Sequence, residues 1–305
     1  MPQRLKVGVQ LPEVERVVRW PELSEMIRTA EGIGLDSIWV GDHLLYTDRG
    51  DEPVGPWEAW SQLAAIAAIT ERVQLGPLVA ATSFHNPAMM AKKAATIQDI
   101  SGGRLILGLG AGWNEAEYRA FGFPYDHRVS RFEEAFTIIR GLLREGHADH
   151  DGSYYQVDDL ALLPPASHPA PPLMVGSKGA RMLAITLPHV DAWNAWWAWF
   201  GNTLEGYLPL RDIVDAACRE VGRDPADVER TVALLVGFDR GVGRAAGDAG
   251  DVQAPPLPGD DPAALAGTLA AFADAGVGHV QLVLDPITVE SIGALEPTLR
   301  RLASA

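Results

Sequence analysis

The chain has 305 residues, of which 47% are hydrophobic and 21% charged, and its formal net charge is −15. This composition is typical of a globular protein with a sizeable core, and the length suits one large α/β domain, so we expect a single domain over residues 1–305. The acidic excess argues against nucleic-acid ligands and anionic membrane surfaces, because both are negatively charged.

Cysteine content and the first residues bear on the compartment. Cys218 is the only cysteine, so an internal disulfide is excluded. Residues 1–4 lack the apolar run of a signal peptide, and no segment is apolar over a stretch long enough to span a bilayer. We therefore expect a cytoplasmic protein in a reducing compartment, without membrane association.

Strand and helix patterns alternate along the whole chain. Apolar runs predict strands at 5–11, 37–40, 73–79, 105–109, 173–175, 191–194, 231–238 and 279–284. Amphipathic segments predict helices at 20–33, 57–70, 88–100, 131–145, 180–187, 204–221, 262–275 and 289–302. Two connections are long: an insertion after the fourth strand, which ends in a proline-rich segment through Pro172, and a Gly/Ala/Pro-rich loop at 241–258 after the seventh, which we expect to be mobile.

The predicted strands are continuously apolar rather than alternating, which indicates a parallel sheet covered by helices on its outer face. Eight strand–helix units over this length predict an α/β fold of the (β/α)8 TIM-barrel type. An open, doubly wound sheet is the alternative.

The segment 101–115 contains a strand that ends in three glycines, Gly108, Gly110 and Gly112. Glycines at such a point let a flat ligand approach the bare backbone, although close packing around a tight turn would use them equally well. A dinucleotide fingerprint fits poorly, because Trp113 stands where the third glycine of Gly-x-Gly-x-x-Gly belongs.

In a (β/α)8 barrel the active site lies at the carboxyl ends of the strands. Asp42 and His43 follow the second strand, and a histidine exchanges protons near neutral pH, so this pair is the catalytic candidate. A structural histidine is the alternative. The other strand ends carry glycines, aromatic residues and few charges. That lining suits a large flat ligand and has too few carboxylates for a metal site.

The turn Gly176-Ser177-Lys178-Gly179 lies between a strand and a helix that begins at Ala180. Free N–H groups at a helix start attract anions, and Lys178 and Arg181 would add positive charge, so the turn predicts a phosphate site. The alternative is an ordinary strand-to-helix turn, and the Gly-Lys-Ser/Thr ending of a Walker loop is absent.

Several of these segments resemble the luciferase-like monooxygenase superfamily, and within it the branch that uses the deazaflavin coenzyme F420. The resemblance rests on the segments 37–43, 75–79 with Asn86-Pro87, 101–122, 176–183 and 189–194. It implies a TIM-like barrel with an insertion and a homodimer. It also implies a hydride-transferring oxidoreductase acting on a small organic substrate.

The resemblance also implies roles for individual residues. The coenzyme ring would lie near His43 and against a bulge with a non-prolyl cis peptide between Leu78 and Val79. The coenzyme-binding residues would be His43, Leu78, Val79, Ala80, Gly110, Ala111, Gly112, Gly176, Ser177, Lys178, Gly179 and Ala180. Substrate would contact Gln10, Trp113 and Trp193, the last being part of a tryptophan cluster that otherwise suggests packing.

The identity of the cofactor depends on position 111. Members that use FMN carry an arginine for the FMN phosphate there, and this chain has Ala111. The difference favours coenzyme F420. A reduced-FMN-dependent monooxygenase using molecular oxygen is the alternative, and a barrel that binds a ligand without catalysis is a third hypothesis.

Overall fold

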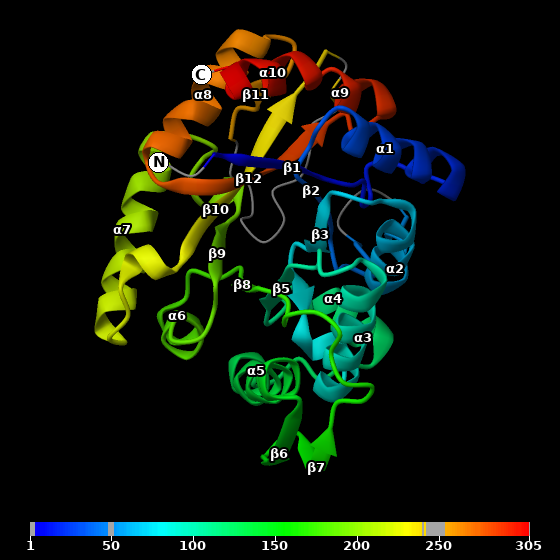
Figure 1. Cartoon of the computed structure of the whole chain (residues 1–305), viewed down its shortest axis with the longest axis vertical. Coiled ribbons are helices and arrows are strands. Elements are labelled where there is room, and N and C mark those ends of the chain that lie inside the picture. Colours follow the sequence, from blue (N-terminus) through cyan, green and yellow to red (C-terminus); the bar gives the residue numbers. More distant parts are fainter. Residues whose placement is uncertain (1–3, 48–51, 240, 242–253, 305) are drawn as a thin grey trace.

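A computed structural model describes residues 4–47, 52–239, 241 and 254–304. Within them, parallel strands form a ring with helices outside it (Figure 1). The strands of the ring are β1 Lys6–Gln10, β2 Ser37–Val40, β3 Gln74–Pro77 with β4 Ala80–Ala81, β5 Leu107–Gly110, β8 Leu173–Val175, β9 Ala192–Ala195, β10 Glu229–Gly237 and β12 Val277–Asp285.

The order of the strands closes the barrel. Hydrogen-bonded neighbours follow the order β3-β2-β1-β12-β10-β9-β8-β5-β4. A parallel bridge between Leu75 of β3 and Leu105, just before β5, connects the two ends of this order. The predicted TIM barrel is confirmed and the open sheet is wrong. The strands are buried almost throughout, because side chains alternate between the barrel interior and the helical layer.

The outer helices begin and end near the predicted positions. Proline occupies the first turn of four of them, α1, α3, α8 and α10, where its missing N–H costs little, and Asn86 caps α3 by accepting from Met89 N. Their bounds are α1 Trp20–Gly32, α2 Ala59–Ile69, α3 Pro87–Ile100, α5 Arg128–Glu145, α6 Ala180–Thr186, α7 Leu204–Glu220, α8 Pro262–Asp274, α9 Val289–Gly293 and α10 Glu296–Ser304. Short 3-10 turns lie at Thr82–Phe84, Trp197–Trp199 and Pro225–Asp227, and β11 Leu257–Pro258 pairs with β10.

Two predicted elements are divided in the structure. The third predicted strand is interrupted at the cis peptide between Leu78 and Val79, the bond that the resemblance implied. The last predicted helix is two helices, α9 and α10. Pro297 lies in the first turn of α10, a position that proline tolerates far better than a helix interior.

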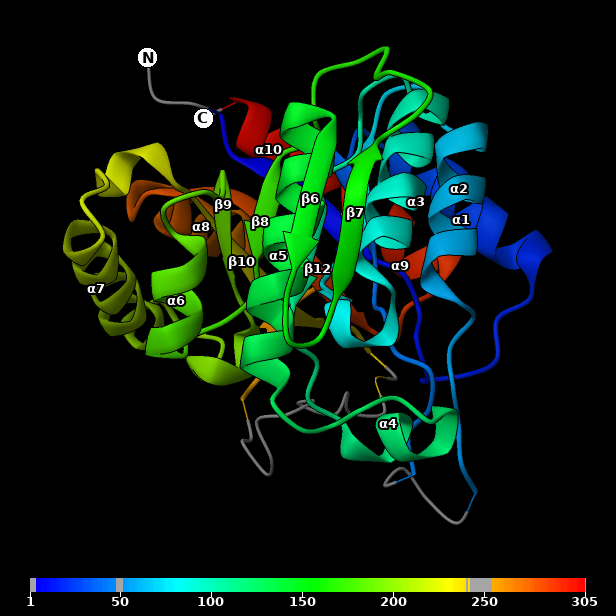
Figure 2. The same cartoon turned by 90° about the horizontal axis from the view of Figure 1, so that it is seen from below.

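The insertion after β5 contains α4 Glu115–Phe121, α5 and an antiparallel hairpin, β6 His147–Asp151 with β7 Gln156–Ala161. The hairpin was missed because its two strands are mostly polar, so the face that is partly buried, with Ala148, Val157 and Leu160, gives no sustained apolar alternation. Glu134 of α5 holds the turn by accepting from the backbone N–H groups of residues 153–155 at 2.9–3.0 Å. Figure 2 shows α4 at one end of the barrel and the hairpin along its flank, so only the first part of the insertion lies near the strand ends.

A polar pair is buried inside the barrel at its other end. His279 Nε2 lies 2.7 Å from Ser37 Oγ, which also accepts from Trp39 Nε1 at 2.7 Å. Burial, helped by the positive charge of Lys6, lowers the pKa of His279 from 6.5 to about 3. His279 is therefore neutral in the folded chain at neutral pH.

This shift predicts acid sensitivity. Once the chain unfolds, His279 regains an ordinary pKa, so below about pH 6.5 the unfolded state binds a proton that the folded state does not. The stabilisation is fully present above about pH 6.5 and is lost, at roughly 1.4 kcal/mol per pH unit, as the pH falls toward about 3. Urea unfolding of the native chain and of His279→Gln between about pH 7 and pH 4 measures it. The variant should show a shallower pH dependence, and parallel curves would contradict the prediction.

Candidate active site

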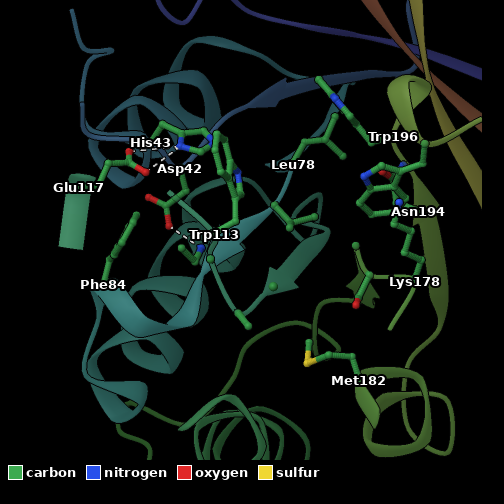
Figure 3. Close-up of a pocket in the computed structure, with 18 of the residues that line it drawn as sticks. Asp42, His43, Leu78, Phe84, Trp113, Glu117, Lys178, Met182, Asn194 and Trp196 are labelled. Atoms are coloured by element: carbon green, nitrogen blue, oxygen red, sulfur yellow. Dashed lines mark hydrogen bonds and ion pairs between the residues drawn. The ribbon is translucent and has the colours of Figure 1, made fainter. Parts of the chain in front are cut away.

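The carboxyl ends of the barrel strands surround a cavity (Figure 3). Of the residues predicted to bind coenzyme or substrate or to catalyse, those lining it are Gln10, Asp42, His43, Leu78, Val79, Gly110, Ala111, Gly112, Trp113, Gly176, Ser177, Lys178 and Gly179. Ala80, Ala180 and Trp193 are not among the lining residues. Figure 3 shows His43, Asp42 and Glu117 on one side of the cavity and Lys178, Trp196 and Asn194 on the other.

His43 is held by a carboxylate that comes from α4. Its Nδ1 lies 3.1 and 3.2 Å from the two carboxylate oxygens of Glu117. The ring also packs against Tyr46 and the edge of Trp113, with centroids 4.8 and 5.5 Å away. These contacts fix the plane of the imidazole at the cavity wall.

The electrostatic surroundings of His43 favour its protonated form. Burial is the largest single effect and lowers its pKa. The hydrogen bond to Glu117 and the negative charges of Glu13, Glu117 and Asp42 together outweigh burial, so the pKa lies above its ordinary value of 6.5. A histidine in this state can donate a proton to a ligand in the cavity.

Glu117 was not predicted as a site residue. It is fully buried, and Asn114, which caps α4 by accepting from Ala116 N, also ties the helix to the loop after β2 by donating to Leu45 O at 2.8 Å. The segment from Asn114 to Tyr118 contains two glutamates, Glu115 and Glu117, and no pattern in it shows which of them faces the second strand.

Asp42 has a different environment from the one its pairing with His43 suggested. Its Oδ2 accepts from Ala81 N at 2.9 Å and lies 3.1 Å from His85 Nε2. Ala81 follows the Leu78–Val79 bulge, and Asp42 is only 3% exposed. These contacts brace the bulge, so the geometry gives Asp42 a supporting role at the cavity wall.

Gln10 and Glu13 form a polar group beside the same wall. Gln10 Nε2 donates to Glu13 Oε1 at 3.0 Å. The Glu13 carboxylate lies where a side chain at position 41 would project, since a Cβ on Gly41 would be 1.4 Å from Glu13 Oε1. Gly41 therefore allows Glu13 to lie against the second strand's end, close to His43.

The clustered glycines accommodate a side chain of the protein itself. A Cβ on Gly108 or Gly110 would lie 2.9 Å from a methyl group of Val79, and one on Gly176 would lie 3.1 Å from it. Gly108 and Gly110 thus make room for the bulge. Gly112 has φ +75° and leaves space for Tyr118, whose hydroxyl donates to Ala111 O at 2.8 Å. The sequence left two explanations for the glycines of this segment, close approach of a ligand and close packing. Close packing accounts for Gly108, Gly110 and Gly112.

The turn after β8 brings Ser177 and Lys178 into the cavity, and the Lys178 ammonium lies 5.5 Å from the ring centroid of Trp199. Arg181 does not join them, because it pairs with Glu133 at 2.9 Å and donates to Ser130 on α5. The expectation that Arg181 supplies charge to this turn is therefore wrong.

Trp193 supports this turn through a hydrogen bond to its backbone. It is fully buried, and its Nε1 donates to Ser177 O at 2.7 Å. A substrate-binding role for Trp193 does not fit this position. The next residue, Asn194, lines the cavity and donates to Thr231 Oγ1 and Gln281 Oε1 at 2.8 Å. The lining residues to which no catalytic or binding role was assigned from the sequence are Glu13, Tyr46, Ala81, Phe84, Glu117, Met182, Asn194, Trp196 and Trp199.

Most of the predicted mobile loop at 241–258 lies outside the described residues. Within the described part of the chain, no three His, Cys, Asp or Glu side chains converge as metal ligands would. No helix there is both long and apolar enough to cross a bilayer.

Comparisons with known proteins agree with this architecture. The F420-dependent glucose-6-phosphate dehydrogenase of Amycolatopsis mediterranei is 31% identical over 242 residues, which cover 77% of this chain and 70% of that protein.

Two solved structures share the fold. An F420-dependent secondary alcohol dehydrogenase in complex with an F420-acetone adduct superposes with a TM-score of 0.78 at 19% identity, covering 98% of this chain and 99% of that one. The oxygenating constituent of 3,6-diketocamphane monooxygenase from Pseudomonas putida, in complex with FMN, has a TM-score of 0.73 at 16% identity, covering 99% and 98%.

The family model described as luciferase-like monooxygenase matches residues 4–249. Because this match extends over most of the barrel and includes the bulge and the cavity wall around His43, the chain belongs to the luciferase-like monooxygenase family.

Proposed function

We propose that the chain is a coenzyme F420-dependent oxidoreductase that transfers a hydride to or from a small organic substrate. The observation that carries this proposal is Ala111 at the cavity wall, where the resemblance associates an FMN phosphate with an arginine. The 31% identity to an F420-dependent dehydrogenase supports the same cofactor.

The residues of the cavity fit a deazaflavin with an anionic tail. Leu78 and Val79 offer an apolar surface for a flat ring, and Ser177 and Lys178 offer a hydroxyl and a positive charge for a phosphate. When bound, the coenzyme would supply or accept the hydride.

The protein's part is to bind and orient both molecules and to move a proton. With a carbonyl substrate, the hydride would come from the reduced coenzyme, and Nε2 of protonated His43 would give a proton to the carbonyl oxygen. With an alcohol substrate, in the oxidising direction, Nε2 of neutral His43 would accept the proton of the substrate's hydroxyl group. Tyr46 and Trp113, which pack on the imidazole, would shape the substrate side.

A reduced-FMN-dependent monooxygenase is the second candidate, because a structure with the same barrel binds FMN. The homodimer and the cytoplasmic location stay predictions. Size-exclusion chromatography with light scattering would test the first.

The cofactor is tested by titrating the purified chain with coenzyme F420 and with FMN, each oxidised and reduced, and following ring fluorescence. Binding of F420 with negligible binding of FMN supports the proposal. Preference for FMN would favour the monooxygenase, and oxygen consumption should then be measured. Failure of both to bind would overturn both assignments.

Replacing Lys178 with methionine tests the phosphate end of this proposal. We expect the Kd for F420 to rise about ten- to a hundredfold, because a charge-assisted hydrogen bond contributes about 1.5–3 kcal/mol. Affinity for the deazaflavin core without its phosphate tail should stay within about twofold. Lys92→Met is the control, since Lys92 lies on α3 outside the cavity. Equal loss of affinity for the core and the whole coenzyme would contradict the placement of the tail.

A further inference from the structure

We propose that Glu117 is a positioning residue that fixes the tautomer of His43: Nδ1 carries a proton toward Glu117, and Nε2 is left to exchange protons with the substrate. The exchange with substrate rests on the proposed function. The effect on the imidazole does not.

The geometry places the carboxylate on one nitrogen only. Both Glu117 oxygens lie within 3.2 Å of Nδ1, while none of the described residues hydrogen-bonds to Nε2. Tyr46 and Trp113 pack against the ring. A turned ring would lose the Glu117 bond and place Nδ1 toward the cavity.

The other contacts of Glu117 keep it an acceptor. Its Oε1 accepts from Leu44 N at 2.5 Å and from Leu45 N at 3.2 Å, and the carboxylate is fully buried. An ionised carboxylate has no proton to donate, so the ring must provide the Nδ1–H of their shared bond. When His43 is neutral, its lone pair is therefore on Nε2.

The negative charges around His43 favour its protonated form. Glu13 from the segment after β1, Asp42 from the end of β2 and Glu117 from α4 all favour a positive imidazole, against the effect of burial. Of these three, only Glu117 is hydrogen-bonded to the ring, so only Glu117 selects which nitrogen faces the cavity.

Glu117 also accepts hydrogen bonds from the backbone N–H groups of Leu44 and Leu45, which gives it a structural role. Truncating the side chain would remove these bonds together with the contact to His43, so the two roles could not be separated. Glu117→Gln keeps an oxygen for the N–H groups of Leu44 and Leu45. It replaces the other oxygen by an NH2 group, which donates to Nδ1 rather than accepting from it. Neutral His43 should then carry its proton on Nε2, the reverse of the native chain.

Nitrogen-15 NMR of histidine-labelled protein without coenzyme measures this directly, because the two ring nitrogens have different shifts in each tautomer. A His43→Asn sample assigns the signals. We expect the neutral native ring to be protonated on Nδ1 and to titrate above pH 6.5. In Glu117→Gln the proton moves to Nε2, and the proton affinity falls by about tenfold or more.

Glu115→Gln is the matched control, since Glu115 is exposed on the same helix, and it should change neither tautomer nor midpoint. If Glu117→Gln retains the native tautomer and midpoint, the proposal is overturned. The native chain alone also decides: a neutral His43 protonated on Nε2 rules the proposal out even if the variant does not fold.

The outcome is separable from that of the proposed function. If neither F420 nor FMN binds while the NMR result holds, the cofactor assignment fails and the positioning role stands. If F420 binds and the tautomer is unaffected by Glu117→Gln, the positioning role alone fails.

Discussion

Replacing His43 with asparagine is expected to lower kcat by about 10²–10⁴-fold while the Kd for F420 changes by less than about fivefold. A positioned general acid or base contributes a factor of this size, and asparagine keeps a polar side chain without a titratable nitrogen. The loss should be in turnover because His43 meets the substrate's reacting oxygen in the proposed reaction. The ring surface of the cavity is formed largely by other residues, Leu78 and Val79 among them.

The measurement is the oxidation of reduced F420 by whichever carbonyl compound gives the highest rate in a screen, followed by absorbance. His127→Asn is the matched control, because His127 is exposed and has φ 52°, a conformation that asparagine accepts. A loss of less than about tenfold would show that His43 does not transfer the proton. A variant that neither binds nor turns over would instead mark His43 as a coenzyme-binding residue.

Replacing Arg104 with methionine is expected to lower the free energy of unfolding by about 3 kcal/mol or more. The guanidinium joins the end of α2 to the start of β5: it donates to the carbonyl oxygens of Ser101, Val73, Thr70 and Ala67 and to Thr70 Oγ1, at 2.6–3.0 Å. Each buried acceptor left without a donor costs about 1–3 kcal/mol, and some of these groups would regain water because Arg104 is half-buried.

Urea unfolding followed by circular dichroism gives this value. Arg300→Met serves as the control, since its pair with Glu296 on α10 is exposed and should contribute less than about 0.5 kcal/mol. A change in Arg104→Met no larger than in the control would mean that water replaces the guanidinium at no cost.

The Arg104 contacts change the interpretation of the segment Ser101-Gly102-Gly103-Arg104, one of the sequence features behind the family resemblance. Gly102 and Gly103 have φ +66° and +89°, so they form the turn that aims the arginine at the end of α2. The segment precedes β5 and lies at the opposite end of the barrel from the cavity. Its role here is to stabilise the fold, and the functional residues of the same strand come after it.

The barrel and the edge at which the site lies can be predicted from the amino-acid sequence. Eight continuous apolar runs, each followed by a helix, allow few arrangements other than a parallel closed sheet, and the carboxyl ends of its strands necessarily meet. His43 and Lys178 could be placed at that edge because each follows a predicted strand, whereas the bulge at Leu78 and Val79 was implied only by the family resemblance. Periodicity and chain order are local properties, and they are readable without contacts.

The directions of the side chains and the contacts between distant residues depend instead on how the elements pack in three dimensions. Glu117 meets His43 across 74 positions of the chain, Val79 fills the space left by three glycines, and Trp193 turns under Ser177 while Asn194 faces the cavity. Adjacent residues of a strand project to opposite faces, so a shift of one position exchanges a lining residue for a supporting one. No local pattern contains that choice, because it is made by the packing of strands and helices that are far apart in the chain.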